Sequence, residues 1–164
     1  MSAKGGPAGA TLVGVLSDTH GVLADDVIQA LSGVQAIVHA GDVVDEDDLE
    51  VLGAIAPVTA VGGNCDRHGR TSWLPRVANV EIGGVRFLVC HSLPDLLARL
   101  DPVSAGASVV VSGHTHRARV EMRHGVLHVN PGSASEPRGA GRSVALVTVA
   151  RDGAVEARIV ELGT

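Results

Sequence analysis

The sequence contains several short apolar runs without polar alternation, and each of them ends in a polar residue that could bind a ligand. Runs of this length fit strands that are buried on both faces of a sheet. In the first half of the chain they alternate with segments whose apolar residues recur at helical spacing, an order that predicts a parallel sheet. The expected strands are residues 11–17, 36–40 and 58–61, and the expected helices are residues 23–31 and 46–55.

The second half of the chain has the pattern of hairpins. Gly83 and Gly84 form a two-residue turn signal between two strand-like runs. These hairpins, together with one further buried run, predict a second, mixed sheet stacked on the first. The expected strands are residues 76–82, 85–90, 107–111, 117–122, 126–129, 143–150 and 154–162, with a short helix at residues 94–100.

A chain of 164 residues is long enough for one domain with a substantial core, expected here over residues 11–164. Residues 1–10 are rich in Gly, Pro and Ala and are expected to form a mobile tail. The formal net charge is −5 and the sequence has no run of Lys or Arg, which argues against nucleic acid or a membrane as the main partner.

Two further features bear on the compartment. No apolar run approaches the ~18 residues of a membrane span, and no signal peptide is apparent. The two cysteines, Cys65 and Cys90, cannot build a disulfide framework. We therefore expect a soluble cytoplasmic protein.

Residues 113–116, Gly-His-Thr-His, place two imidazoles two positions apart directly after a predicted strand. Side chains at this spacing in an extended segment face the same way, so both rings can serve one metal site. Two ligands rarely complete a site, and other predicted strands also end in potential ligands. The full set is Asp18, His20, Asp42, Asn64, His91, His114 and His116.

Carboxylate oxygens and imidazole nitrogens suit Mn²⁺, Fe, Zn or Ni and do not form a thiolate site. Seven ligands are too many for one ion and suit two ions, ~3.5–4 Å apart, that share a bridging carboxylate. Two such cations lower the pKa of a bridging water from ~15.7 towards ~7 and so supply hydroxide at neutral pH. The same pair can clamp the oxygens of a phosphate ester, and the sequence has no motif for a Ser, Cys or Lys nucleophile.

The remaining aromatic and histidine side chains are given no part in this chemistry. His39 lies inside an apolar run and is expected to make a buried hydrogen bond, while His68, His124 and His128 are assigned structural roles. The single Trp73 and the single Phe87 do not supply a stacking platform for bases.

The ordered motifs resemble those of the calcineurin-like metallophosphoesterase superfamily, which run D-x-H, G-D, G-N-[HC]-[DE], a further H, and G-H-x-H. In this chain they read 18–20, 41–42, 63–66, His91 and 113–116. The resemblance extends over nearly the whole chain after the tail. Residues 130–133 (Asn-Pro-Gly-Ser) and the pair Pro137-Arg138 resemble the small bacterial and archaeal phosphodiesterase branch of that superfamily.

The resemblance implies an αββα sandwich of two mixed sheets flanked by helices, with a dinuclear metal site at the carboxyl-terminal edge of the strands. It implies that Asp42 bridges the two ions and that Asn64 also acts in catalysis by orienting the phosphate. The implied ligands are Asp18, His20 and His116 for the first ion, and Asn64, His91 and His114 for the second.

Two positions depart from the family pattern. Cys65 follows the asparagine where many members have His, and a thiol with a pKa near ~8.5 is a weaker general acid than an imidazolium. Ser92 follows His91 where the family commonly has H-G-H or H-G-D, so a contact near the second ion is absent. Arg67 comes directly after the turn that contains Cys65. Both residues are candidates for contact with a substrate phosphate.

We therefore expect a metal-dependent phosphodiesterase that hydrolyses small phosphate esters with a metal-bridging hydroxide. The chain has no room for a cap domain, so the site should be open. The expected cofactors are two divalent ions, with Mn²⁺ preferred and Fe, Ni, Zn or Mg as alternatives. The alternative function is a non-catalytic scaffold like the retromer subunit of this fold. A metal-dependent amidohydrolase fits the metals but not the ordered motifs, and a homo-oligomer stays open.

Overall fold

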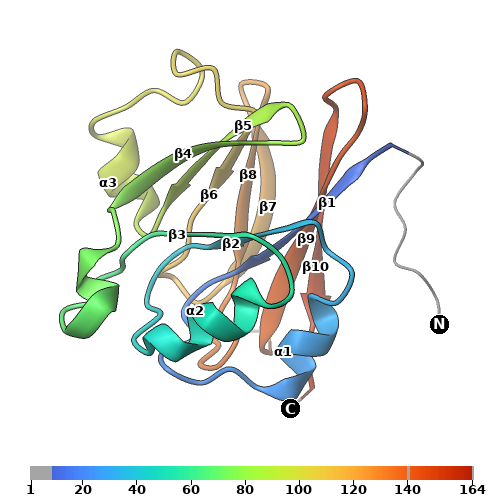
Figure 1. The fold of residues 1–164 in the computed structure, drawn as a ribbon. Coiled ribbons are helices and arrows are strands. Elements are labelled where there is room, and N and C mark those ends of the chain that lie inside the picture. The colour runs from blue at the N-terminus through green and yellow to red at the C-terminus, as the bar shows by residue number, and fades with distance from the viewer. Residues whose placement is uncertain (1–8, 140, 164) are drawn as a thin grey trace.

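The computed structural model of the protein describes residues 9–139 and 141–163. Two β-sheets face each other, and helices lie on their outer surfaces (Figure 1). The mobile tail expected at residues 1–10 lies, apart from Gly9 and Ala10, outside the described residues. None of the helices in the described part of the chain is both long and apolar enough to cross a membrane.

The first sheet has three parallel strands at one side and an antiparallel hairpin at the other. Strand β1 lies in the middle, between β2 on one side and β9 on the other. In spatial order the strands are β10 (Val155–Glu161), β9 (Ser143–Val149), β1 (Thr11–Leu16), β2 (Ala36–His39) and β3 (Val58–Ala60).

The place of the last hairpin differs from the sequence-based expectation. Residues 143–150 and 154–162 were expected in the second sheet, but β9 and β10 extend the first sheet and run antiparallel to β1. Strand β9 is buried along almost its whole length, which suits an interior strand of either sheet. The local pattern identified the strands and their pairing with each other. It could not identify β1 as the third partner.

The second sheet is also mixed. Its three central strands, β5, β6 and β8, are parallel to one another, and an antiparallel strand closes each edge. In spatial order the strands are β4 (Val77–Ile82), β5 (Val85–Cys90), β6 (Val109–Val111), β8 (Val126–Pro131) and β7 (Ala118–Arg123).

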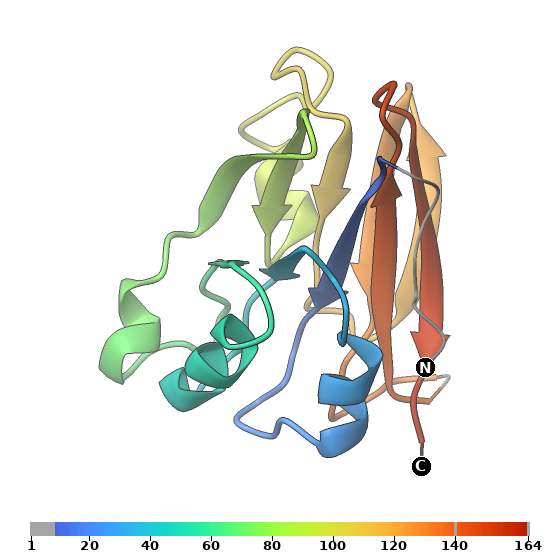
Figure 2. The ribbon, with the colours of Figure 1, turned by 45° about the vertical axis from the view of Figure 1, so that its right-hand side comes forward.

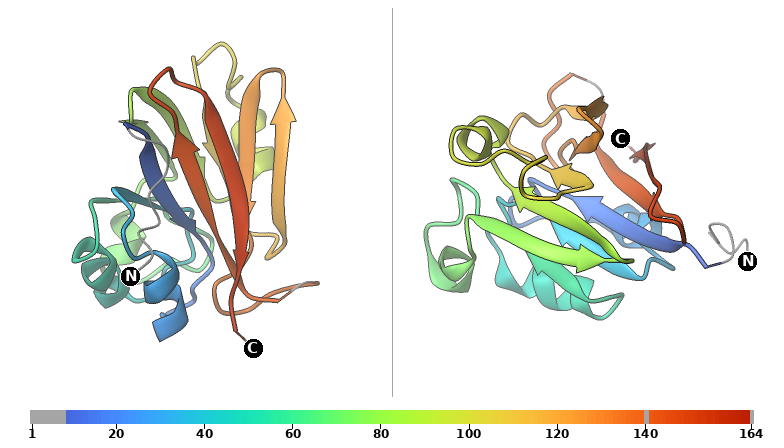
Figure 3. Two further views of the ribbon diagram at one scale, coloured as in Figure 1. Left: turned by 90° about the vertical axis from the view of Figure 1, so that its right-hand side faces the viewer. Right: turned by 90° about the horizontal axis from the view of Figure 1, so that it is seen from above.

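The helices cover the outer faces of both sheets (Figures 2 and 3). Helices α1 (Asp25–Ala30) and α2 (Glu46–Gly53) pack on the first sheet, where Leu31 and Leu52 join one buried cluster. Helix α3 (Leu93–Leu97) packs on the second sheet through Leu96. A separate Val-rich layer with Phe87 fills the space between the sheets. The expected αββα sandwich is therefore confirmed, and a short 3₁₀ helix, η1 (Gly69–Trp73), was not expected.

The parallel strands of both sheets run toward the same end of the molecule (Figure 2). Loops that follow β1, β2, β3, β5, β6 and β8 therefore meet at one edge. In open α/β sheets this edge is where ligands bind, because the chain leaves each strand there without closing the crevice between loops.

His39, at the end of β2, ties two of these loops together. Its Nδ1 accepts a hydrogen bond from the Gly41 amide at 3.2 Å, and its Nε2 lies 3.0 Å from the Thr19 hydroxyl. Because the amide can only donate, Nδ1 carries no proton and Nε2–H donates to Thr19. Burial lowers the pKa of His39 to about 4, so the ring is neutral at pH 7. The expected buried hydrogen bond is confirmed.

The neutral His39 should make stability depend on pH. Its pKa is depressed in the folded state relative to ~6.5 in the unfolded chain, so the unfolded chain binds the extra proton. The stabilising contribution is complete above pH ~6.5 and is lost as the pH falls toward the folded pKa. Between pH 7 and pH 4.5, His39 should lower the free energy of unfolding of the wild type by roughly 2–3 kcal/mol. We expect this part of the decrease to be absent in His39→Gln.

Urea denaturation at both pH values measures this effect. His68→Gln makes the same chemical change at an exposed imidazole and should keep the wild-type pH dependence. Identical pH dependence in His39→Gln and the wild type would show that the buried ring is not the source.

Candidate metal centre

The backbone at the edge where the loops meet is strained at the predicted ligand positions. Five of the seven predicted ligands have a positive φ: Asp18 (54°), His20 (48°), Asp42 (55°), His114 (72°) and His116 (57°). This left-handed conformation is uncommon for residues other than glycine and clusters at functional sites. Strands β1, β2 and β6 are therefore each followed by a sharp turn that carries candidate ligands at the shared edge.

Glycines in the motifs allow these loops to approach one another. A Cβ at Gly63 would collide with the Asp42 carboxylate, and one at Gly113 would lie 2.7 Å from Asp18 Oδ2. A Cβ at Gly41 would lie 2.8 Å from His91 Nδ1. Real Cβ atoms essentially never come this close to another atom, so all three glycines are needed for the spacing of the loops. Gly41 is also needed for its turn, since its φ is 99°.

The first group of predicted ligands is tightly gathered. Asp18, His20, Asp42 and His116 each offer one ligand atom, and these atoms all lie within 4.8 Å of one another. His116 Nε2 lies 3.2 Å from Asp18 Oδ1 and 3.3 Å from His20 Nε2. Asp18 Oδ1 is buried and has no hydrogen-bond partner among the described residues. A buried carboxylate oxygen without a donor, beside two imidazole nitrogens, fits a cation bound between them.

The second group adjoins the first through Asp42. Asn64 Oδ1 lies 3.0 Å from His91 Nε2 and 3.2 Å from His114 Nδ1. His91 Nε2 in turn lies 3.3 Å from Asp42 Oδ2, and His20 Nε2 lies 3.7 Å from the same oxygen. The structure thus brings all seven predicted ligands to one edge, with Asp42 between the two groups.

Backbone carbonyls orient two of the imidazoles. His91 Nδ1 donates to the Ala40 carbonyl at 2.8 Å, and His116 Nδ1 donates to the Glu136 carbonyl. Since a carbonyl only accepts, the proton of a neutral ring is on Nδ1 and the Nε2 lone pair faces the carboxylates. This is the tautomer that a metal-binding imidazole needs, and such outer hydrogen bonds fix its direction.

Several residues without a predicted role support the loops. The buried Asp66 carboxylate accepts from the amides of Val43, Val44 and Gly63 at 2.7–3.2 Å, so it joins the loops after β2 and β3. The Ser133 hydroxyl donates to the Asp18 carbonyl at 2.7 Å.

Asn130 has a similar supporting role, since its side-chain amide donates to the Gly113 carbonyl and the Thr115 hydroxyl, both at 3.1 Å. These residues belong to motifs that the sequence analysis quoted, but the pattern alone did not indicate which groups they hold.

Charges at the site stabilise one another. Burial opposes ionisation of Asp42, but hydrogen bonds from His91 and from the Cys65 amide outweigh it and hold the pKa of Asp42 well below its usual value. Burial likewise opposes protonation of His91, but the Asp42 and Asp18 carboxylates outweigh it and raise the pKa of His91. The pocket is therefore built to hold positive charge.

The predicted substrate contacts lie beside Asn64. The Cys65 amide donates to Asp42 Oδ1 at 2.8 Å. The Cys65 side chain reaches solvent, but its partial burial and the nearby Asp42 charge raise the pKa of the thiol. Arg67 Nε donates to the Asn64 carbonyl at 2.7 Å. Cys65 and Cys90 are both free, and the Cys65 thiol stays neutral at pH 7.

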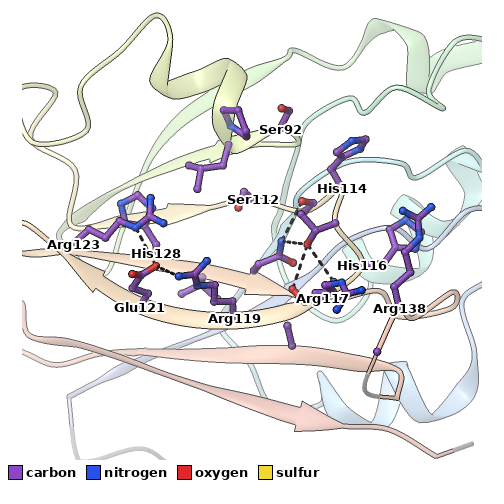
Figure 4. A pocket seen from close by; sticks show the side chains of 18 of the residues that line it. Ser92, Ser112, His114, His116, Arg117, Arg119, Glu121, Arg123, His128 and Arg138 are labelled. Atoms are coloured by element: carbon purple, nitrogen blue, oxygen red, sulfur yellow. Dashed lines mark hydrogen bonds and ion pairs between the residues drawn. The ribbon is translucent and has the colours of Figure 1, made fainter.

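Two grooves meet at this edge. One has a volume of about 800 Å³ and is bordered by His114 and His116, and the other, of about 770 Å³, is bordered by Asn64, His91 and His114. Ser92 and His114 line both grooves. His114 thus lies where the two grooves adjoin, and Figure 4 shows the larger of the two.

Known proteins resemble this chain in both sequence and fold. A probable metallophosphoesterase of Methanothermobacter thermautotrophicus is 34% identical over 93% of either chain. The phosphoesterase YfcE of Escherichia coli superimposes with a TM-score of 0.67 and 28% identity, covering 93% of this chain and 100% of YfcE. Vacuolar Protein Sorting 29 of Cryptosporidium parvum superimposes with a TM-score of 0.71 over 94% of this chain and 99% of its own, but at 22% identity it shows the fold alone.

The family comparison agrees with the residues gathered at the edge. The calcineurin-like phosphoesterase superfamily domain matches residues 12–152, which include all seven predicted ligands. On this match and on its curated relatives, the chain belongs to the calcineurin-like phosphoesterase superfamily.

Proposed function

We propose that the protein hydrolyses phosphodiesters with two divalent cations held at the edge of its two sheets. The observation that carries this proposal is the position of Asp42 between two groups of ligands, together with the unpartnered buried oxygen of Asp18. The proposed ligands are Asp18, His20 and His116 for one ion, Asn64, His91 and His114 for the other, and Asp42 for both.

The chain's own groups have separate tasks in this proposal. When bound, the ions supply an acidified water as nucleophile and neutralise charge on the phosphate. Asp42 stays ionised because of its hydrogen bonds and supplies negative charge to both positions. In their neutral form, His91 and His116 present unprotonated Nε2 atoms, because a backbone carbonyl holds the remaining proton of each ring on Nδ1. The Asn64 side chain turns its oxygen to the histidines, which leaves its Nδ2 as a donor for a phosphate oxygen.

The two grooves favour a diester over a monoester. A diester has two organic arms, and a groove leads away from each side of His114. Both grooves are open to solvent, which fits small and varied esters. Relatives named phosphodiesterase include YfcE of Escherichia coli, 33% identical over 75% of this chain.

The mixed oxygen and nitrogen donors favour Mn²⁺, with Fe, Ni, Zn and Mg as the competing choices. The proposed compartment is the cytoplasm, in keeping with two free cysteines. The competing proposal is a scaffold that keeps the fold without turnover, and the similarity to Vacuolar Protein Sorting 29 motivates it. The intact ligand set and the orienting hydrogen bonds favour the enzyme.

Hydrolysis of bis-p-nitrophenyl phosphate with added Mn²⁺ tests the proposal directly. The wild type should turn over, and Asp42→Asn should lose activity by about 10³-fold or more because both ions lose a charged ligand. Asp25→Asn, the same change at an exposed carboxylate on α1, should keep wild-type activity. An inactive wild type in Mn²⁺, Zn²⁺ and Ni²⁺ buffers would favour the scaffold, and an active Asp42→Asn would refute the bridging role.

Gly113→Ala should weaken Mn²⁺ binding by at least about tenfold, because the new methyl group meets Ser17 and Asp18. Titration calorimetry measures this. Gly53→Ala is the matched control, since its Cβ meets nothing within 4 Å and it lies at the end of a helix. It should keep the metal affinity and gain about 0.5–1 kcal/mol of stability. Equal Mn²⁺ affinities in both variants would contradict the close packing of the loops.

Cys65→His should raise activity selectively on esters with poor leaving groups. The Cys65 thiol is neutral and its pKa is raised, so it is a weak acid for protonating an alkoxide. An imidazolium at this position should increase kcat on alkyl esters by roughly 10²-fold, with little change on p-nitrophenyl esters. Parallel kinetics with one aryl and one alkyl diester measure the ratio, and an unchanged ratio would exclude a proton-donor position here.

A further inference from the structure

The larger groove at the metal centre carries a concentration of positive charge. Its lining includes four arginines and a single glutamate, a formal charge of +3 on a chain whose net charge is −5. The sequence shows no basic run because these arginines are spread over residues 117–138. The fold brings them to one groove (Figure 4): Arg119 and Arg123, with Glu121, lie on β7, Arg117 directly precedes that strand, and Arg138 lies in the loop after β8.

Strand β7 arranges the outer part of this cluster. Arg119, Glu121 and Arg123 alternate along the strand and therefore share one face. The Glu121 carboxylate accepts from Arg119 Nη2 at 2.9 Å and from Arg123 Nε at 3.0 Å. One carboxylate thus holds two guanidinium groups in place and neutralises only one of them. The remaining N–H groups stay available to a ligand.

The charged face is continuous with the metal centre. Asn130 pairs with Arg119 across the strands, and the Asn130 side chain donates to the Gly113 carbonyl in the loop that carries His114 and His116. Arg119 is therefore one cross-strand pair from the metal-binding loop. Arg123 lies four residues farther along β7, about 14 Å at the usual rise of a strand.

The opposite wall of the groove is different in chemistry. Leu93 and Pro94, at the start of α3, line it. His128 also lines the groove, and its buried Nδ1 has no hydrogen-bond partner in the part of the chain that the structure describes. An apolar wall facing a cationic wall suits an organic unit that bears a phosphate. The apolar part of such a ligand can contact the first wall, and its phosphate can contact the arginines.

We infer that this groove selects phosphodiesters in which one arm is a nucleoside-sized unit bearing a further phosphate, and that Arg119 binds that second phosphate. The inference rests on the proposed function, since it places the scissile phosphate at the metal centre. It assigns the groove a role in specificity, because a substrate with uncharged arms leaves the arginines unused. Glu121 acts as a positioning residue for both guanidinium groups.

Calorimetric titration of the Mn²⁺-loaded protein with two nucleotides tests the inference. Thymidine 3′,5′-bisphosphate should bind at least about tenfold more tightly than thymidine 5′-monophosphate, as expected for one added charge-assisted contact. Arg119→Gln should reduce this gain to below about twofold. Arg158→Gln removes the same charge from an exposed position on β10 and should keep the gain. Arg119 is exposed, so its replacement should leave the fold intact, which the Mn²⁺ affinity of the variant verifies.

The outcomes separate the two proposals. Equal affinity for the two nucleotides in the wild type, or a gain that survives in Arg119→Gln, overturns the role of the groove. Hydrolysis of bis-p-nitrophenyl phosphate, whose arms carry no further charge, reports on the proposed function alone. A protein that binds the bisphosphate through Arg119 without turning over that ester would support the anion-binding groove and refute the diesterase.

Discussion

The Asp42 carboxylate is the interaction on which the rest of the site depends. It accepts a hydrogen bond from the Cys65 amide, faces His91 on one side and His20 on the other, and lies in a turn with a positive φ. The negative charge of Asp42 stabilises the imidazoles that lie close together at this edge. The strands of both sheets deliver their loops to within reach of this one side chain, so the sandwich and the site form a single arrangement.

Holding this arrangement requires support from outside the ligand set. Left-handed backbone at the ligand positions costs free energy that the surrounding hydrogen bonds must offset. Asp66 ties two loops by accepting from three amides. Ser133 ties the loop after β8 to the loop after β1, and Asn130, near the end of β8, ties that strand to the loop after β6. His39 joins the first two loops from beneath. These hydrogen bonds between loops hold the candidate ligands next to one another.

The strands, and the convergence of the seven candidate ligands at one edge, could be predicted because both depend on local signals, while the binding of metal by these residues stays a prediction. An apolar run followed by Asp, Asn or His needs no knowledge of distant partners, and all seven ligands converge as expected. Pairing order is a nonlocal property, so the placement of residues 143–150 beside β1 was missed.

The arginine groove was missed for the same reason. It combines β7, the loop after β8 and the start of α3, and no window of sequence contains these three pieces.

The placement of β9 next to β1 has a consequence for biosynthesis. Strand β1 is the middle strand of its sheet, and one of its two neighbours, β9, lies 130 to 138 residues farther along the chain. Until β9 is in place, one side of β1 lacks its hydrogen-bonded partner strand. Such distant pairing slows folding and leaves an unpaired strand edge exposed in the nascent chain. Assembly of the metal-binding edge is therefore completed only after β9 has been synthesised and has paired with β1.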